Sequence, residues 1–156
     1  MRKAADLLAR PWLTVRAQIA LGAIFVAAAI PKLVDPPAFA HLIYNYRLVP
    51  APFLNLFALV LPSLEILLGV ALLLGIWKRT AAGLAGLLLF VFLAALSFNL
   101  VRGNAIDCGC FDVSVAGRTV AERLSGMRMD VLRDIGLLAL PAQILWATRR
   151  GEAFGS

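Results

Sequence analysis

Four long stretches of the chain are almost wholly apolar, and shorter polar stretches separate them. A hydrocarbon core of about 30 Å is crossed by about 20 helical residues, which is close to the length of each stretch. The pattern predicts an all-α fold, an integral membrane four-helix bundle that forms one domain over residues 1–156. The predicted spans cover about residues 13–33, 53–77, 80–101 and 131–148.

The connection between the first two spans has the signals of a helix. Asp35 followed by Pro36 is typical of an N-cap with a proline in the first turn. The apolar residues that follow recur at helical spacing as far as Pro50, which cannot continue a helix. We therefore expect a short amphipathic helix that lies in the membrane interface.

The connection between the third and fourth spans, residues 102–130, has a helix start of its own. Thr119 and Glu122 have the spacing of a capping box, in which each side chain accepts a hydrogen bond from the other residue's backbone N–H group. They predict a short interfacial helix over about residues 120–125 that ends at Gly126. This helix is expected to form a lid next to the rest of the connection.

The composition agrees with a membrane protein and argues against a soluble domain. Hydrophobic residues make up 62% of the chain, charged residues make up 15%, and the mean hydropathy is +0.88. The net charge of +6 comes from 15 basic residues that lie at the ends of apolar stretches rather than in one patch. We therefore expect a lipid bilayer around the chain and no nucleic-acid partner.

The orientation in the membrane follows only weakly from the charges. With both termini on one side, that side has eight Lys and Arg residues and the other side has seven. The short, doubly basic turn at residues 78–79 favours the side with the termini as cytoplasmic. Three tryptophans fall on that same face, as an interfacial belt would place them (Trp12, Trp77 and Trp146). We expect a multi-pass protein of the bacterial inner (cytoplasmic) membrane, with both termini in the cytoplasm and residues 102–130 in the periplasm.

Both cysteines of the chain lie in this periplasmic connection, one residue apart, in Cys108-Gly109-Cys110. A zinc site is weakly supported, because a closed site needs four ligands and His41 could add only a third. A purely structural disulfide is disfavoured, since so small a ring removes little chain entropy and strains the bridge. The same strain makes a disulfide easy to reduce and re-form. We therefore favour a redox-active Cys108–Cys110 disulfide that exchanges with thiols.

Charged residues inside the apolar stretches are the second signal of function, since a charge in hydrocarbon is costly and usually faces the bundle interior. Glu65 lies near the middle of the second span, and Lys32 lies near the outer end of the first. The two could form a buried ion pair that fixes the helix register, or Glu65 could relay protons or contact a cofactor. Lys32, and Arg133 at the start of the fourth span, could also have only structural roles, such as reaching the lipid headgroups.

One uncharged polar side chain inside a span is a further candidate. Asn99 lies in the outer half of the third span, a few residues before the cysteine connection. Its amide could hold the carbonyl group of a quinone or bond to a neighbouring helix, and the helix contact is the commoner role.

Several short motifs occur in an order that resembles one family of membrane proteins. Cys-Gly-Cys-Phe is the most specific of them, and the resemblance extends from about Arg16 to Leu145. The family is the MauE family of methylamine utilisation, within the wider DoxX-like membrane proteins. Asp112 stands where the family pattern has glycine. The motifs are Pro31-Lys32-Leu33, Tyr46-x-Leu48-x-Pro50, Pro62-x-x-Glu65, Cys108-Gly109-Cys110-Phe111 and Arg133-Asp134.

The resemblance implies a four-helix inner-membrane protein linked to periplasmic disulfide formation or thiol redox chemistry. Because the chain has a single cysteine pair, we expect that pair both to take electrons from a periplasmic thiol protein or small thiol and to pass them to a quinone. The candidate catalytic residues are then Cys108, Cys110 and Glu65. The candidate quinone-binding residues are Lys32, Glu65, Asn99 and Arg133.

Three other functions stay open from the sequence. A cysteine connection that docks a partner without turnover would make the protein a membrane assembly or maturation partner. A path lined by Glu65 and Lys32 would make it a small transporter, although four spans are few unless the chain forms a homo-oligomer. A metal-binding protein is the third alternative.

Overall fold

The computed structural model describes residues 11–104 and 119–154, and within those ranges it contains helices and no strand. Four segments are long and apolar enough to cross a membrane, which confirms the predicted all-α, four-span fold. The side of the membrane on which the termini lie stays a prediction. The elements are α2 (Pro11–Val34), α3 (Pro36–Tyr46), the 3₁₀ helix η1 (Ala51–Phe53), α4 (Leu54–Leu74), α5 (Lys78–Val101) and α6 (Val120–Phe154).

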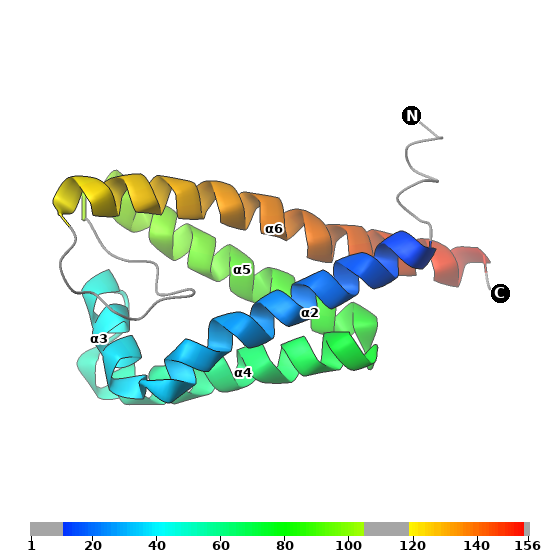
Figure 1. The fold of residues 1–156 in the computed structure, drawn as a ribbon, viewed down its shortest axis with the longest axis horizontal. Helices are drawn as coiled ribbons and strands as arrows, with labels where there is room; N and C mark the ends of the chain where they lie inside the picture. The colour runs from blue at the N-terminus through cyan, green and yellow to red at the C-terminus, as the bar shows by residue number, and fades with distance from the viewer. Residues whose placement is uncertain (1–10, 105–118, 155–156) are drawn as a thin grey trace.

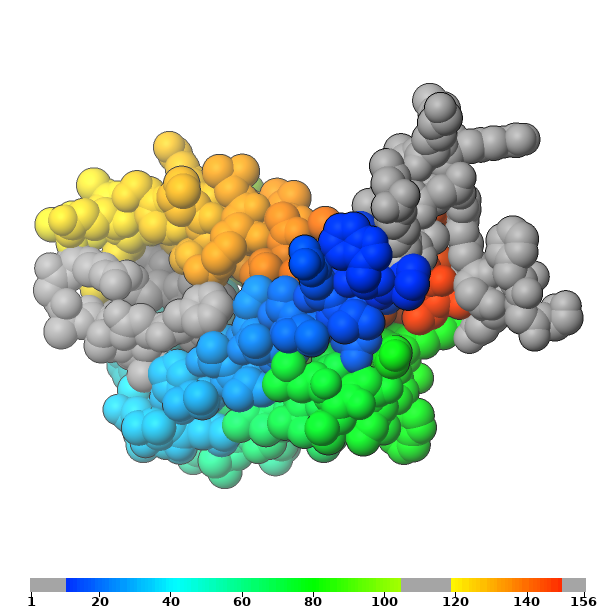
Figure 2. All heavy atoms as spheres, turned by 45° about the vertical axis from the view of Figure 1, so that its right-hand side comes forward, coloured from blue at the N-terminus to red at the C-terminus, as the bar shows by residue number. Residues whose placement is uncertain are grey.

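The long helices form two antiparallel pairs, α2 with α4 and α5 with α6 (Figure 1). The pairs meet mainly where α2 lies against α6 and where α4 lies against α5. The start of α2, the turn between α4 and α5, and the end of α6 lie at one end of the bundle. At the other end, which we call the α3 end, lie α3, the end of α5 and the start of α6. Figure 2 shows the side chains of α2 in continuous contact with those of the green α4–α5 region.

The largest apolar core lies where the four long helices meet, and α2 and α4 cross closely there. A Cβ atom added at Gly22 would lie 2.8 Å from the carbonyl oxygen of Gly69. Small residues at such a crossing let membrane helices approach, and close packing is what holds helices together in lipid. The crossing therefore sets the register of α2 against α4. The buried core residues are Ala17, Leu21, Phe25, Leu68, Leu72, Ala81, Ala82, Ala85, Leu89 and Ile144.

The turn between α4 and α5 requires left-handed backbone at two positions. Gly75 has a φ of 71°, and its N–H group donates to the carbonyl oxygen of Leu72 at 3.1 Å. Glycine adopts this conformation without the clash that a Cβ atom would cause. Trp77, with a φ of 45°, precedes the first residue of α5. The second span therefore ends at Leu74 rather than at the predicted residue 77.

The short helix α3 begins as predicted. The side chain of Asp35 accepts a hydrogen bond from the backbone N–H of Ala38 at 3.1 Å, which is an N-cap. The helix ends before the predicted proline stop, because Arg47 adopts left-handed backbone with a φ of 52°. One face of α3 is buried against Ala58 of α4, through Phe39, Leu42 and Ile43. This packing holds α3 across the end of the bundle.

The capping box that was predicted before the fourth span is present. The N–H of Thr119 donates to Oε2 of Glu122 at 2.7 Å, and the N–H of Glu122 donates to Oγ1 of Thr119 at 3.3 Å. The predicted helix end at Gly126 is wrong, because α6 continues through this residue without a break. A glycine inside a helix costs only about 1 kcal/mol relative to alanine, and tertiary contacts can exceed that cost.

A tertiary contact of this kind is made by Met127, the residue after Gly126, which is buried against Leu96 of α5. Helix α6 has 35 residues, so it rises about 52 Å at 1.5 Å per residue. This exceeds a hydrocarbon core of about 30 Å, and α6 therefore extends beyond the membrane. The predicted connection of residues 102–130 is shorter in the structure, since α6 already begins at Val120.

Candidate functional site

Lys32 of α2 and Glu65 of α4 form a buried ion pair between the helices. The Nζ atom of Lys32 lies 2.6 Å from Oε1 and 2.8 Å from Oε2 of Glu65. Only 3% of Lys32 and 4% of Glu65 is exposed, so Lys32 does not extend to the headgroups. Of the arrangements considered from the sequence, the buried pair is the one present.

The two side chains meet because α2 and α4 are antiparallel. A helical side chain inclines towards the N-terminus of its own helix. Lys32, near the end of α2, therefore inclines into the bundle, and Glu65, in the middle of α4, inclines towards the α3 end. Gly69 follows Glu65 by one turn, so the close helix crossing also holds the carboxylate against α2.

A second group of charges lies on the opposite wall, on α6. Arg133 contacts Asp130 at 3.0 Å through Nη1 and Asp134 at 3.5 Å through Nε. Asp134 is 3% exposed, whereas the Arg133 side chain is 36% exposed. Asp134 is thus as deeply buried as the ion pair, and Arg133 connects it to the surface of the bundle.

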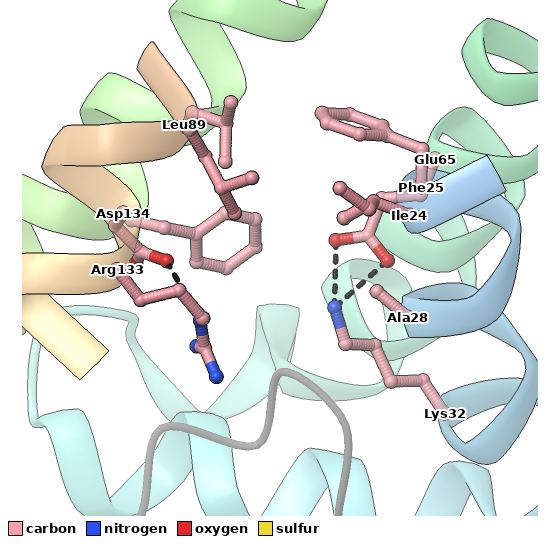
Figure 3. A pocket seen from close by; sticks show the side chains of 10 residues that line it. Ile24, Phe25, Ala28, Lys32, Glu65, Leu89, Arg133 and Asp134 are labelled. Carbon is pink, nitrogen blue, oxygen red and sulfur yellow. Dashed lines mark hydrogen bonds and ion pairs between the residues drawn. The ribbon is translucent and has the colours of Figure 1, made fainter. Parts of the chain in front are cut away.

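A small cavity separates these two groups of charges. Figure 3 shows Lys32 and Glu65 on one wall and Arg133 and Asp134 on the other. All four long helices contribute to the lining, and the cavity volume is about 40 Å³. Four of its lining residues are charged and six are apolar. The arrangement brings two carboxyl groups and two cationic groups to one small space inside the bundle, which is suited to proton transfer and to polarising a bound carbonyl group.

Two aromatic rings surround the ammonium group of Lys32. Its Nζ atom lies 5.3 Å from the ring centroid of Phe39 on α3 and 5.3 Å from that of Phe92 on α5. Both distances are within the range of cation–π attraction. The rings help to offset the loss of water around Lys32, and Phe92 also lines the cavity.

Asn99 is fully buried, but it is not among the residues that line the cavity. Its Nδ2 atom donates to the carbonyl oxygen of Ala95 at 3.0 Å and to that of Tyr46 at 3.3 Å. Its Oδ1 atom accepts a hydrogen bond from Asn104 at 3.3 Å. The amide therefore joins α5 to the end of α3, and the structure does not bring it to Lys32, Glu65 and Arg133.

Comparison with known proteins identifies the family. The model of the family described as methylamine utilisation protein MauE matches residues 10–147. The chain belongs to the MauE family. Curated MauE proteins with similar sequences include those of Paracoccus denitrificans, with 41% identity over 108 residues, and Methylorubrum extorquens, with 44% identity over 106 residues. The MauE protein of Methylophilus methylotrophus is 37% identical over 101 residues.

The matched region is only part of each MauE relative. It covers 69% of this chain and 58% of the Paracoccus denitrificans protein, and 67% and 57% for the Methylorubrum extorquens protein. For the Methylophilus methylotrophus protein the shares are 64% and 53%. The chain thus spans a little over half the length of the curated MauE proteins that it matches. No solved structure matches it significantly.

The two cysteines of this MauE-family chain, Cys108 and Cys110, lie outside the described residues. The helices that flank their segment end and begin at the α3 end of the bundle (Figure 1). His41, considered above as a metal ligand, is exposed on α3 and lies near Tyr44, with 6.4 Å between the ring centroids. Within residues 11–104 and 119–154, no group of three or more His, Cys, Asp or Glu could hold a metal ion.

Two residues of the site were not among the candidates from the sequence. Asp134 was noted only as part of the Arg133-Asp134 motif, although a carboxyl group inside an apolar stretch is itself a signal of function. Phe92 could not, since a phenylalanine in a long apolar stretch has no feature that distinguishes it from its neighbours. Its role depends on the position of Lys32 on another helix of this MauE-family fold.

Proposed function

We propose that this multi-pass membrane protein is a thiol–disulfide oxidoreductase that acts in methylamine utilisation. Its relatives carry the name methylamine utilisation protein, and the Cys108–Cys110 pair supplies the chemistry. The observation that supports the proposal most is the cavity between Lys32–Glu65 and Arg133–Asp134, because charged groups buried in a membrane bundle are typical of substrate sites and proton relays.

The residues around the cavity suit a quinone carbonyl group. An ammonium group has three N–H donors, of which two are used by the carboxylate of Glu65 in the structure. Lys32 and Arg133 could therefore each donate to a carbonyl oxygen from opposite walls. The other lining residues are apolar, as an uncharged ring requires (Ile24, Phe25, Ala28, Leu89, Phe92 and Leu137).

In the proposed reaction, a thiolate of the reduced partner attacks one sulfur of the Cys108–Cys110 disulfide, and a mixed disulfide forms. The second partner thiolate resolves it, so the partner is oxidised by two electrons and both cysteines become thiols. Binding of a quinone would supply the oxidant: when the two thiols re-form the Cys108–Cys110 disulfide, their two electrons and two protons would convert the quinone to a quinol, which would then leave. Glu65 and Asp134 hold and deliver the protons at the cavity, and Lys32 and Arg133 orient the carbonyl oxygens.

The proposal includes a location and a partner. The chain would lie in the bacterial inner membrane with the cysteine segment in the periplasm, where disulfides persist. The electron donor would be a periplasmic protein dithiol or a small thiol. The α3 end of the bundle, where α5 ends and α6 begins, would then face the periplasm.

The test is quinone reduction by a reduced dithiol peptide, measured with purified protein in lipid nanodiscs and ubiquinone-2. We expect the unaltered protein to convert peptide and quinone in a ratio of one to one. Cys108→Ser and Cys110→Ser should each lower the rate to the uncatalysed background, while Ser125→Ala, at an exposed position on α6, should leave it unchanged. A rate that is unaffected by both cysteine substitutions would contradict the proposal and favour a non-catalytic assembly partner.

A further inference from the structure

A second, larger space lies next to the charged cavity, between α3, α4 and α5. Its volume is about 170 Å³. We call it the apolar groove, and its lining includes Phe39, Ile43, Phe57, Leu61, Leu88 and Phe92. Neither the family name nor the motifs assign a role to this groove.

The groove and the charged cavity share a wall. Phe92 lines both spaces, and Phe39 lines the groove while it lies 5.3 Å from the ammonium group of Lys32. The rings of Phe39 and Phe92 are thus what separates the Lys32 ammonium from the groove. Phe92 is half-buried, and its side chain forms part of the wall of both spaces.

The depth of the charged cavity limits what could occupy both spaces, since the groove extends from Phe92 to Tyr46 and Leu48 at the α3 end. Glu65 lies eleven residues after Leu54, the first residue of α4, which is about 16 Å along a helix and near the middle of a core of about 30 Å. A phospholipid keeps its charged headgroup at the membrane surface, so its polar part would not reach Glu65. A ligand with a weakly polar, uncharged head and an apolar tail can lie at this depth entirely.

We propose that the apolar groove binds the isoprenoid tail of a quinone whose ring lies at Phe92, beside Lys32. This inference rests on the proposed function and adds the tail site. The groove lining residues that approach Glu65 are Leu61, one turn before it on α4, and Leu88, next to Leu89 of the charged cavity. The head and the tail of one molecule would therefore meet at Phe92.

The inference predicts that the tail of the quinone matters to affinity. Ubiquinone-2, which has two isoprene units, should bind the protein in nanodiscs more tightly than tail-free ubiquinone-0, by about tenfold or more. Leu88→Trp would fill the groove and should remove this preference, while leaving the affinity for ubiquinone-0 unchanged. Leu87→Trp is the matched control, because Leu87 immediately precedes Leu88 on α5, is 57% exposed and does not line the groove.

Binding is measured directly, by equilibrium titration of the oxidised protein without a thiol substrate. If Leu88→Trp lowers the amount of folded protein, Phe57→Trp fills the same groove from α4 at a position that is 40% exposed. Equal binding of ubiquinone-2 by Leu88→Trp and Leu87→Trp, or no binding by the unaltered protein, would overturn the inference.

Failure of the inference can be distinguished from failure of the proposed function. Thiol oxidation that depends on ubiquinone-2 but is unchanged by Leu88→Trp would leave the oxidoreductase in place and reject the tail site. Conversely, tight binding of ubiquinone-2 that Leu88→Trp abolishes, without any thiol oxidation, would support the tail site and reject the oxidoreductase.

Discussion

The ammonium group of Lys32 lies 2.6 and 2.8 Å from the two carboxylate oxygens of Glu65, and this contact joins α2 to α4 inside the bundle. The pair is reinforced by the close crossing of the same helices at Gly22 and Gly69. It faces Arg133 and Asp134 of α6 across a cavity. The pair therefore contributes both to the register of the helices and to the lining of the proposed site.

Removing one member of the ion pair should destabilise the protein more than removing both. Lys32→Met leaves the Glu65 carboxylate buried without its partner, and such a loss costs about 3–5 kcal/mol. The double variant Lys32→Met/Glu65→Leu has no unpaired charge, so it should cost less than either single variant. Reversible unfolding in lipid–detergent micelles measures the free energy of unfolding of Lys32→Met, Glu65→Leu and the double variant, with Ser125→Ala as the control. Additive costs would show that the two residues do not stabilise each other.

The close crossing of α2 and α4 should not tolerate a methyl group. In Gly69→Ala the new Cβ atom would lie 2.8 Å from Val26 Cγ2 and 2.9 Å from the carbonyl oxygen of Gly22, and that backbone atom can move only with its helix. We expect a loss of about 1–3 kcal/mol in the free energy of unfolding.

Gly83→Ala on α5 is the matched control for this crossing. Its new Cβ atom would meet nothing closer than Leu145 Cδ2 at 3.9 Å, which is an ordinary contact. The free energy of unfolding of the Gly83→Ala variant should stay the same or rise slightly, because alanine is the better helix former. Equal effects of the two substitutions in the same unfolding assay would contradict the close packing of α2 on α4.

The sequence was sufficient for the features that depend on local patterns. Four apolar stretches of spanning length identified the four long helices, and Asp35 correctly marked the start of α3. Thr119 correctly marked a helix start, but the helix is α6 itself rather than a separate short helix before the fourth span. A carboxylate and an amine in neighbouring apolar stretches identified Glu65 and Lys32, because in hydrocarbon each has few alternatives to the other.

The features that the sequence could not supply depend on tertiary contacts. Gly126 resembles a helix end, and the burial of Met127 against α5 is a tertiary contact that favours the continuation of α6. The sequence favours a helix contact for Asn99 over a ligand contact, but it cannot supply the partner, which in the structure is the carbonyl oxygen of Tyr46. Phe92 acquires its place beside Lys32 only once α2 and α5 are packed in the same bundle.

The continuity of α6 leads to a stabilising substitution. Gly126 is exposed, and a Cβ atom added there would meet nothing within 4 Å. Gly126→Ala should therefore stabilise the protein by up to about 1 kcal/mol, since it replaces the more flexible residue inside a helix. Thermal unfolding of the purified protein checks this, and Gly103→Ala is the contrast. Gly103 has a φ of 70°, so alanine there is strained and should not stabilise. Destabilisation by Gly126→Ala would mean that α6 is interrupted at this residue.

The proposed orientation can be tested with a maleimide that does not cross membranes. After mild reduction of spheroplasts, Cys108 and Cys110 should be labelled from outside, because the proposal places them in the periplasm. In a Cys108→Ser/Cys110→Ser background, Lys78→Cys at the exposed α4–α5 turn should be labelled only after the membrane is opened. The reverse pattern would place the termini outside and reject the periplasmic assignment.

The proposal predicts different effects of substitution at Arg133 and at Arg128, which both lie on α6. Arg133 lines the charged cavity, whereas Arg128 is exposed and does not. Arg133→Gln removes a cationic donor from the wall opposite Lys32, so the KM for ubiquinone-2 in dithiol oxidation should rise about tenfold, the effect of losing a charged hydrogen bond of about 1.4 kcal/mol. Arg128→Gln should leave the KM unchanged.

The rate of the first, quinone-independent exchange between the dithiol and the Cys108–Cys110 disulfide should be the same in both variants, because that step does not involve the cavity. If Arg133→Gln slowed this exchange as well and left the KM for ubiquinone-2 unaltered, Arg133 would act on the cysteine segment rather than on a quinone.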